Sequence, residues 1–460
     1  MKVVETQETD PAGVYASWLQ ETQYKEVPAD IVGLHKGLLL DTLGVMLAGA
    51  YQAGASQAYD YVKNWGGKPE ARIIAHGDRV PLPNAAVVNA GMARALDFAD
   101  HGMELIVPVL ISTADLAGNI NGKELITALV LSSEIRSRIS RASKATAKII
   151  PEYRLPAGYH WGPICAAARL LNLTIDQTWS AIGLGFHCVT DTSTQGLLEG
   201  TLASRAWNMF QANNAVSSVL WAKAGVTGTR NVFLGKRGYL AFSYPNGNEP
   251  ALLTRGLGTE WMPEFNQKTY SIGSMAQSAI QIARDIVKEN KVALEDIALM
   301  EFGSAFEPMT AHTSGKWDPK TMTEGQFSLP YGVATGLVKG KVFVDDYAPE
   351  EMQRPDVQAL LEKIKVSLSD DLVSNPDFRW GAKLKMTLKN GAVYRKEMMY
   401  QPGHQKNPLT WDAIVNKFHV CASYVKLPQE NQDRIISMIS DIEGLKDATE
   451  LVDLLIIDRG

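Results

Sequence analysis

Residues 84–101, NAAVVNAGMARALDFADH, form a helical pattern rich in small side chains. Small side chains let neighbouring helices approach closely, and Gly102 stands where a C-terminal cap would end such a helix. Similar patterns flank this stretch at 31–47, 123–142 and 174–190, the last of which opens with the capping-box residues Thr174 and Gln177. The pattern extends from about residue 12 to residue 260, and it predicts a large all-α domain.

The pattern changes after Trp261. One amphipathic helix follows, and its apolar face is formed by Met275, Ala279, Ile282 and Ile286. IALMEFGS at 297–304 is then typical of a strand. Residues 383–397 alternate in polarity on both sides of Asn390-Gly391, which favours a hairpin with a type I′ turn, since both central positions of that turn need positive φ.

We therefore predict a mainly α fold, with a large all-α helical domain and a smaller α+β domain. The helical domain comprises residues 1–265 together with 405–460, because the last helix, which Pro428 opens, is expected to return to it. The α+β domain comprises residues 266–404.

Composition and charge exclude several classes of protein. The chain has 460 residues, of which 45% are hydrophobic and 21% charged, and 45 basic against 50 acidic residues give a net charge of −5. Disorder needs low hydrophobicity and high net charge, and nucleic-acid binding needs a basic stripe, so we expect neither. The three cysteines form no paired spacing and the N-terminus lacks a signal-peptide pattern. The apolar stretch 38–50 contains Asp41 and is shorter than a membrane span. We expect a cytoplasmic protein that binds no membrane.

Motifs of several common catalytic sites are missing from the sequence. It contains no G-x-G-x-x-G after a strand, no phosphate-binding loop, no G-x-S-x-G and no H-E-x-x-H. The eight histidines are dispersed, and no pair has convincing metal-ligand spacing. Acid–base chemistry by side chains gathered from distant positions therefore remains the best candidate.

Four places in the sequence could supply such groups. Asp97 and His101 are four residues apart and would share one face of a helix, as a carboxylate and the imidazole it orients. His160 lies in the Gly-rich segment AGYHWGP, Lys268 in FNQKTYSIG and Tyr331 in FSLPYGVA. Each also has a structural interpretation, since Asp97 and His101 could be a solvated capping pair and a loop histidine is usually only exposed.

Several segments together resemble the MmgE/PrpD family, in the order in which the family has them. They are LLLDTLGVMLAG at 38–49, NAAVVNAGMARALDFAD at 84–100, YHWGPICAAARLLNLTIDQTWSAIGLG at 159–185, QKTYSIG at 267–273, FSLPYGVATGLVKG at 327–340 and PLTWDAIVNKF at 408–418. The family includes 2-methylcitrate dehydratase, cis-aconitate decarboxylase and an iminodisuccinate epimerase. The resemblance implies a helical domain with a smaller α+β domain, a homodimer, and chemistry without a metal or an organic cofactor.

The resemblance also assigns site residues. Positions that match the family's site are Asp97, His160, Lys268 and Tyr331. Other site positions differ. His101 stands at a threonine position and Gly273 at a histidine position, and the His-Pro-Ser that follows in relatives is missing. The family's K-[RP]-L-H-x-G falls on residues 204–209, where Ser204, Arg205 and Trp207 are the candidate substrate-binding residues together with Gly273.

Three functional hypotheses remain open. One is an altered lyase, isomerase or cyclase with a biosynthetic role, whose less cationic site moves protons on a small carbonyl or carboxylic acid metabolite. Another is a genuine dehydratase or decarboxylase of citrate-like acids, which need several cations because each desolvated carboxylate requires a charge-assisted partner. A third is a non-catalytic descendant that binds a ligand.

Overall fold

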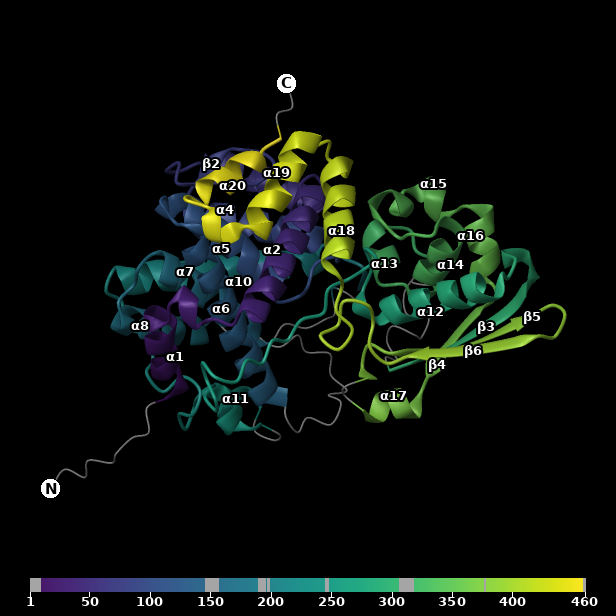
Figure 1. Cartoon of the computed structure of the whole chain (residues 1–460), viewed down its shortest axis with the longest axis horizontal. Helices are drawn as coiled ribbons and strands as arrows, with labels where there is room; N and C mark the ends of the chain where they lie inside the picture. Colours follow the sequence, from purple (N-terminus) through teal and green to yellow (C-terminus); the bar gives the residue numbers. More distant parts are fainter. Residues whose placement is uncertain are drawn as a thin grey trace.

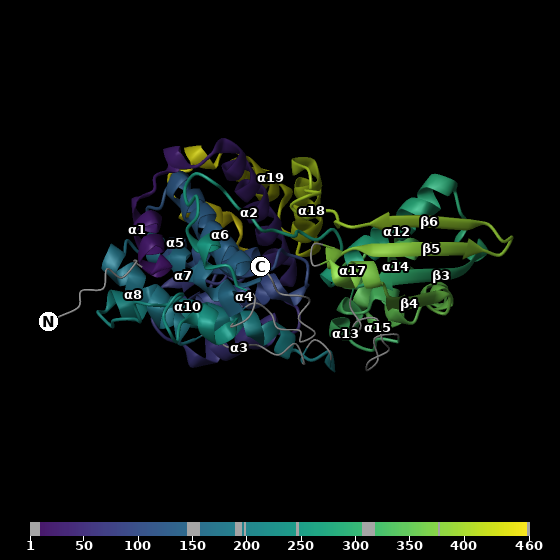
Figure 2. The same ribbon diagram turned by 90° about the horizontal axis from the view of Figure 1, so that it is seen from below.

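The computed structural model describes residues 10–144, 157–188, 196, 199–244, 248–305, 318–375 and 378–457. It is mainly helical with a small mixed sheet, which confirms the predicted fold class. Figures 1 and 2 show a helical region beside a region built around the sheet. The longer helices of the helical region are α1 (Pro11–Glu21), α2 (Ala29–Gly49), α3 (Ala55–Trp65), α4 (Leu82–Ala95), α5 (Met103–Ala117), α6 (Gly122–Lys144), α7 (Trp161–Leu170), α8 (Ile175–Phe186), α10 (Ala203–Lys223), α18 (Trp411–Tyr424), α19 (Gln429–Ser440) and α20 (Thr449–Leu454).

Helix α2 runs through the middle of the helical region and packs against α4 and α18. It is longer than the apolar stretch 38–50 suggested, and its length and composition would suit a membrane span. However, 78% of its most apolar window is buried inside the fold, as in the core helix of a globular protein. A Cβ added at Gly49 would lie 2.1 Å from the carbonyl oxygen of Met92, so the close crossing of α2 and α4 requires glycine there.

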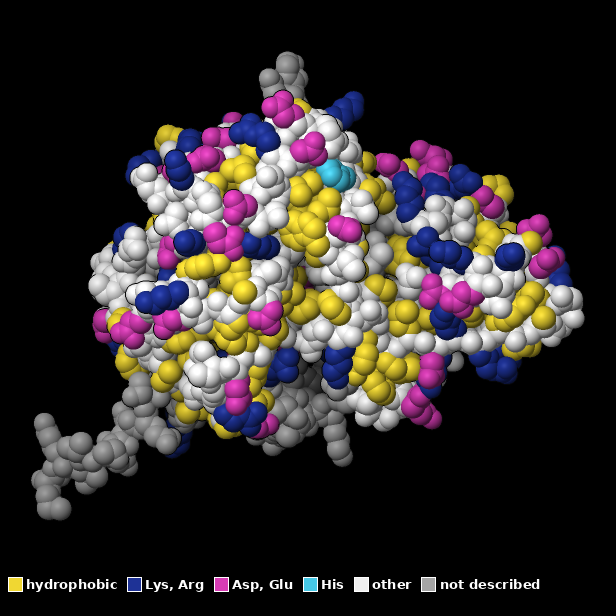
Figure 3. All heavy atoms as spheres, viewed as in Figure 1, with side chains coloured by type: hydrophobic (Ala, Val, Ile, Leu, Met, Phe, Trp, Pro, Cys, Tyr) yellow, Lys and Arg dark blue, Asp and Glu magenta, His cyan; other side chains and the backbone are white. Residues whose placement is uncertain are grey.

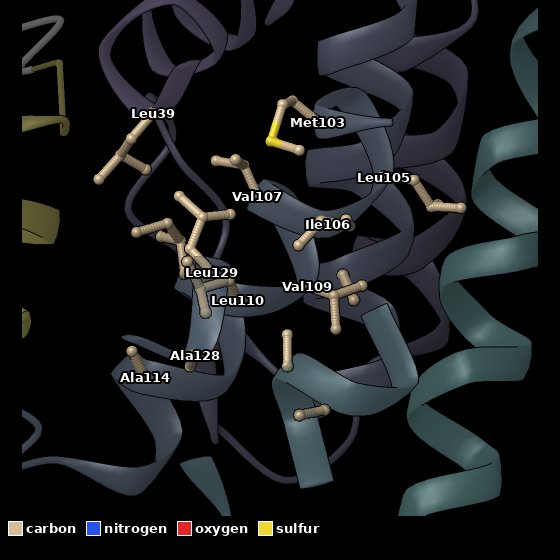
Figure 4. Close-up of a cluster of buried hydrophobic side chains, with 14 of the residues drawn as sticks. Leu39, Met103, Leu105, Ile106, Val107, Val109, Leu110, Ala114, Ala128 and Leu129 are labelled. Carbon is tan, nitrogen blue, oxygen red and sulfur yellow. The ribbon is translucent and has the colours of Figure 1, made fainter. Parts of the chain in front are cut away.

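The hydrophobic core of this region forms where α2, α5 and α6 meet. Figure 4 shows Leu39 of α2 near Val107 and Leu110 of α5 and Leu129 of α6, and all four side chains are fully buried. Fully burying one such side chain contributes about 1.5–3 kcal/mol. The core therefore fixes the start of α5 firmly relative to its neighbours.

The expected helix over 84–101 ends earlier than predicted. Helix α4 stops at Ala95, and Asp97 adopts the left-handed region with φ +46°, which an α-helix cannot contain. Gly102 is the N-cap residue of α5 and does not cap the C-terminus of α4. The prediction that Asp97 and His101 share a helix face is therefore wrong, because both lie in the connection between two helices.

The sheet has the strand order β4-β3-β5-β6. Its strands are β3 (Ile297–Ser304), β4 (Ile364–Leu368), β5 (Ala382–Leu388) and β6 (Val393–Met398), and only β3 and β4 pair in parallel. Its helices include α12 (Ser274–Asn290), which packs on β5 and β6, α13 (Met322–Gln326), α14 (Leu329–Lys339), α15 (Pro349–Met352), α16 (Pro355–Leu361) and α17 (Asp370–Ser374). A second hydrophobic core lies between the sheet and α12 and α14.

The hairpin predicted over 383–397 is formed by β5 and β6, but its turn differs from the prediction. Gly391 has φ +86°, whereas Asn390 is not among the residues with positive φ, so the turn is not type I′. The Gly391 N–H donates to the Leu388 carbonyl, and the Ala392 N–H donates to the Asn390 side chain at 3.0 Å. A single left-handed position is therefore enough to reverse the chain here.

Charged side chains of both signs are mixed over the face of the molecule drawn in Figure 3. This arrangement agrees with the nearly balanced count of basic and acidic residues. Positive charge on this face is not gathered into one stripe.

Candidate active site

The candidate site lies where the two regions meet. The end of α4, the connection 96–102 and the start of α5 form one side, and the start of α10 closes another. The segment 266–273, which leads into α12, brings the sheet region against them. Groups from three separate stretches of the chain are thereby gathered.

Asp100 holds the connection in place. Its carboxylate accepts hydrogen bonds from the N–H groups of Gly102 at 2.8 Å and Met103 at 3.0 Å, which caps α5. It also accepts from the Asn266 N–H at 2.6 Å, and so ties α5 to the segment that carries Lys268. A buried side chain thus positions the two sides of the site relative to each other.

A buried ionic cluster forms the centre of the site. The Asp97 carboxylate lies 2.8 Å from Arg94 Nη1 and 3.0 Å from Lys268 Nζ. Lys268 Nζ also donates to the Asp97 carbonyl at 3.0 Å. All three side chains are at most 2% exposed. Asp97 and Lys268, which the sequence separates by more than 170 positions, are therefore direct partners.

Glu104 and His101 extend this cluster. Arg94 Nη1 donates to Glu104 Oε1 at 3.0 Å, and that same oxygen lies 3.2 Å from His101 Nδ1. The Glu104 side chain is fully buried, whereas the His101 side chain is 23% exposed. Arg94 therefore links both carboxylates of the cluster. His101 is the most solvent-exposed side chain of the five described.

The charges of the cluster shift one another's pKa values. Burial alone would raise the pKa of the Asp97 carboxyl, but Lys268 and Arg94 together hold it well below its usual range. Burial is likewise outweighed at Glu104, whose pKa is lowered chiefly by Arg94. Burial lowers the pKa of Lys268 despite the nearby Asp97. Both carboxylates are therefore ionised acceptors at neutral pH.

Arg205 of α10 packs against the cluster. Its Nη1 donates to the Arg94 carbonyl at 3.2 Å, and its Nη2 donates to Gln326 Oε1. Its Nε has no hydrogen-bond partner among the described residues, although the side chain is buried. Burial and the neighbouring Arg94 lower the pKa of Arg205 to about 10. Arg205 thus carries a buried N–H that a ligand could satisfy.

The other predicted substrate-binding residues, Ser204, Trp207 and Gly273, differ in their contacts with the cluster. Ser204 uses its carbonyl to accept from Arg94 Nε at 3.3 Å and its hydroxyl to donate to the Thr201 carbonyl. Trp207 is 8% exposed, and its Nε1 has no partner within the described part of the chain. Gly273 is the N-cap residue of α12, and its N–H donates at 2.8 Å to the carbonyl of Gln326, whose side chain accepts from Arg205.

His160 and Tyr331 are not in contact with the cluster in the described structure. His160 Nε2 lies 3.0 Å from the Gly185 carbonyl, and its ring packs on Trp161. The Tyr331 hydroxyl donates to the Asp346 carbonyl, and burial raises the pKa of Tyr331 to about 12. The Tyr331 ring packs on Tyr347, whose hydroxyl donates to the Ser271 carbonyl beside the site.

Sequence reasoning missed Arg94, Glu104 and Lys417. Lys417 of α18 forms a buried ion pair with Asp41 at 2.7 Å and donates to the carbonyls of Phe98 at 2.8 Å and Lys268 at 2.9 Å. The available signal was a charged residue within an otherwise apolar helix, since a buried charge is almost always paired. Arg94 and Asp41 both show that signal in the sequence.

The donor set suits anion binding and proton transfer. Arg and Lys side chains stabilise carboxylates and developing oxyanions, and an imidazole held by a carboxylate can accept or donate a proton. Within the described residues, no three side chains of His, Cys, Asp and Glu gather as a metal-binding group.

Two family models match the chain. The MmgE/PrpD N-terminal domain matches residues 14–250, and the MmgE/PrpD C-terminal domain matches residues 270–443. The chain is 24% identical to the cis-aconitate decarboxylase-like protein oryM of Aspergillus oryzae, over 98% of both chains. It is 22% identical to the cis-aconitate decarboxylase of Mus musculus, over 96% of this chain and 92% of the other. A mitochondrial 2-methylcitrate dehydratase of Yarrowia lipolytica is 24% identical over 62% of this chain and 57% of its own. The chain belongs to the MmgE/PrpD family.

Proposed function

We propose that the protein is a lyase or isomerase that needs no cofactor and moves protons with its own side chains on a small carboxylic acid or carbonyl metabolite. The buried cluster at the junction of the two regions carries this proposal. Three cations, Arg94, Arg205 and Lys268, stand against two carboxylates, Asp97 and Glu104, so 3 − 2 leaves one positive charge. An anionic substrate or an enolate would balance that charge.

The chemistry needs one base and one stabilising cation. When a base removes a proton from the carbon next to a carbonyl, the C–H electron pair moves towards the carbonyl oxygen, where negative charge develops. A buried N–H of Arg205 or the Lys268 ammonium can stabilise that charge without reorganisation. Return of a proton gives exchange or isomerisation, and departure of a β-substituent with its electron pair gives an elimination. In a decarboxylation, the loss of CO₂ takes the place of proton removal: the C–C electron pair forms the enolate, and a protonated side chain then supplies the proton to carbon.

The substrate is expected to carry fewer carboxylates than citrate-like acids. The described cations of the cluster already bind protein groups, because Arg94 bonds both carboxylates, Lys268 bonds Asp97, and Arg205 bonds a carbonyl and Gln326. Few donors remain for a ligand, and each further carboxylate brought out of water needs a partner of its own. This supports a substrate with one carboxylate or a neutral carbonyl group.

A second candidate is decarboxylation of cis-aconitate. The relatives that carry this name match the chain over nearly their whole lengths. This observation favours a shared reaction, whereas the paired cations favour an altered substrate. The two proposals differ in the number of carboxylates that the site should accept.

An exchange assay in D₂O distinguishes these functions. The protein is incubated with cis-aconitate, 2-methylcitrate and a series of 2-oxo and 3-oxo monocarboxylic acids, and ¹H NMR follows deuterium uptake and product formation. The proposal predicts deuterium uptake into a monocarboxylic acid, reduced about 100-fold in K268M. Turnover of cis-aconitate alone would favour the second candidate. No change in any acid, with saturable binding of one, would identify a binding protein instead.

A further inference from the structure

His101 makes two close contacts through the same ring nitrogen. Its Nδ1 lies 3.2 Å from Glu104 Oε1 and 3.1 Å from Arg94 Nη1. An ionised carboxylate only accepts hydrogen bonds, and a guanidinium only donates them. Nδ1 therefore bonds Glu104 when it carries a proton and bonds Arg94 when it does not.

The surroundings of the ring favour a proton on Nδ1. Arg94 of α4 and Glu104 of α5 contact the ring directly, and Asp97 in the connection interacts electrostatically with His101, Lys268 and Arg205. Arg94 Nη1 already has Asp97 at 2.8 Å and Glu104 at 3.0 Å as acceptors, so it does not depend on the imidazole. Fully buried Glu104 has few other donors to satisfy its charge.

His101 is also the member of the cluster that solvent can reach. Its side chain is 23% exposed, whereas those of Arg94, Asp97, Glu104 and Lys268 are at most 2% exposed. A proton that enters or leaves the cluster from a substrate therefore passes most directly through the imidazole. With Nδ1 bonded to Glu104, Nε2 is the nitrogen that can accept it.

We propose that His101 is the catalytic base of this site and that Glu104 is the positioning residue that keeps the Nδ1–H tautomer. This inference rests on the proposed function and names its proton acceptor. Nε2 takes the proton from the substrate carbon, and the C–H electron pair moves onto the carbonyl oxygen. The imidazolium that forms is stabilised by Glu104, its Nε2 proton exchanges with solvent because the ring is 23% exposed, and Nε2 then returns a proton or, in D₂O, a deuteron to the substrate.

His101 is better placed than His160 to be the catalytic base. His160 Nε2 faces the Gly185 carbonyl and therefore acts as a donor in that contact. The family-matched histidine is thus bound to the backbone, and the histidine that replaces a threonine sits in the ionic cluster.

The first test measures where the proton lies, without any substrate. Protein labelled with ¹⁵N-histidine is examined by NMR, and H101Q assigns the His101 resonances. We expect Nδ1 to be the protonated nitrogen in the neutral ring of the wild type, and we expect E104Q to shift the population towards the Nε2–H tautomer. A bare Nδ1 in the wild type would overturn the proposal, whatever activity is found.

The second test uses deuterium exchange on the acid found in the panel described above. We expect H101Q to reduce kcat at least 100-fold and E104Q to reduce it about tenfold, with KM changed less than twofold. H419Q and E134Q are matched controls, since His419 Nδ1 contacts Gln432 at 2.8 Å and Glu134 forms a buried pair with Arg138, both outside the cluster.

The outcomes separate the two proposals. Undiminished exchange in H101Q would overturn the assignment of the base and leave the proposed function standing. A loss in H419Q as large as that in H101Q would overturn it as well, because the effect would then belong to any partly buried histidine. No exchange of any acid by the wild type would overturn the proposed function, and the catalytic role of His101 with it.

Discussion

Replacement of Lys417 by Met should cost the protein far more stability than the loss of one ion pair at the surface. Lys417 Nζ lies 2.7 Å from Asp41 Oδ1 and 3.8 Å from the centre of the Phe98 ring, and it donates to the carbonyls of Phe98 and Lys268. The two side chains are 7% and 0% exposed, so water cannot replace the lysine.

The magnitude follows from what K417M leaves behind. Asp41 becomes a buried carboxylate without its cation, and breaking such a pair costs about 3–5 kcal/mol. Two buried carbonyls also lose a donor, at about 1 kcal/mol or more each. Protonation of Asp41 limits the total, because burial already raises the pKa of this carboxyl despite the presence of Lys417. We expect a loss of about 4 kcal/mol in the free energy of unfolding at pH 7.

The pH dependence tests the assigned cause. In K417M the folded state binds a proton at Asp41 that the unfolded state does not bind at neutral pH. The folded state thus binds more protons, so the deficit of the variant should shrink as the pH falls from 7 towards 5. The double variant D41N/K417M removes the charge and should recover about 2 kcal/mol of the loss.

Urea denaturation followed by circular dichroism measures these differences. K36M is a matched control, because Lys36 also joins a carboxylate, Glu443 at 2.7 Å, to a backbone carbonyl, but with 15% and 29% exposed side chains. It should cost at most about 1 kcal/mol. If K417M costs no more than K36M, or if D41N/K417M is as unstable as the sum of both single variants, the buried pair does not have the role described.

Three further predictions concern a buried histidine, a close helix contact and the unpaired arginine nitrogen. Burial lowers the pKa of His35 to about 4, so between pH 6.5 and 4 the unfolded state binds more protons. Wild-type stability should therefore fall by about 3 kcal/mol across that range, and urea titrations of H35Q should lack this loss. G122A should be destabilised by more than about 3 kcal/mol in thermal unfolding, since its Cβ would lie 1.7 Å from the Ile442 carbonyl oxygen, and G33A, with open space at its Cβ, is the control. R205M should raise KM for an anionic substrate about tenfold or more while Tm changes little, because the loss of two hydrogen bonds from Arg205 is offset by removal of a charge that burial and Arg94 disfavour in the folded protein. A large fall of Tm in R205M would contradict that reasoning.

Helix and strand positions were predictable from the sequence because they depend on local periodicity. The strand 297–304 and the capping box at Thr174 are found as predicted. The end of α4 was not predictable, because the backbone of Asp97 turns left-handed where an ordinary helical residue would continue the pattern. Tertiary contacts accompany this turn, since Lys268 Nζ donates to the Asp97 carbonyl and also pairs with the Asp97 carboxylate. The predicted type I′ turn at Asn390 was wrong because an Asn-Gly dipeptide is compatible with more than one turn type.

The candidate site was predictable only in part. Asp97, His101, Arg205 and Lys268 do lie together, but the spacing argument for the first two relied on a helix that ends before them. Arg94 links Asp97 and His101, and in the sequence it is a single charged residue among small side chains. Sequence spacing reports neighbours along a helix, whereas this cluster depends on contacts between segments far apart in the chain.

The junction of the two regions sets the geometry of the site, because each side contributes charges that the other must neutralise. Arg94, Asp97 and Glu104 belong to the helical region, and Lys268 enters on the segment that leads to the sheet region. The Ser271 hydroxyl donates to the Leu96 carbonyl at 2.8 Å, and Asp100 and Lys417 bind the same segment.

Separation of the two regions would therefore leave Asp97 with one cation fewer and Lys268 with none of these acceptors. Both changes are costly for groups that are fully buried. The same ionic contacts that hold the two regions together also keep Asp97 ionised and Lys268 in place. Stability at the junction and readiness of the site for proton transfer thus depend on one set of interactions, and a substitution that loosens the junction should impair both together.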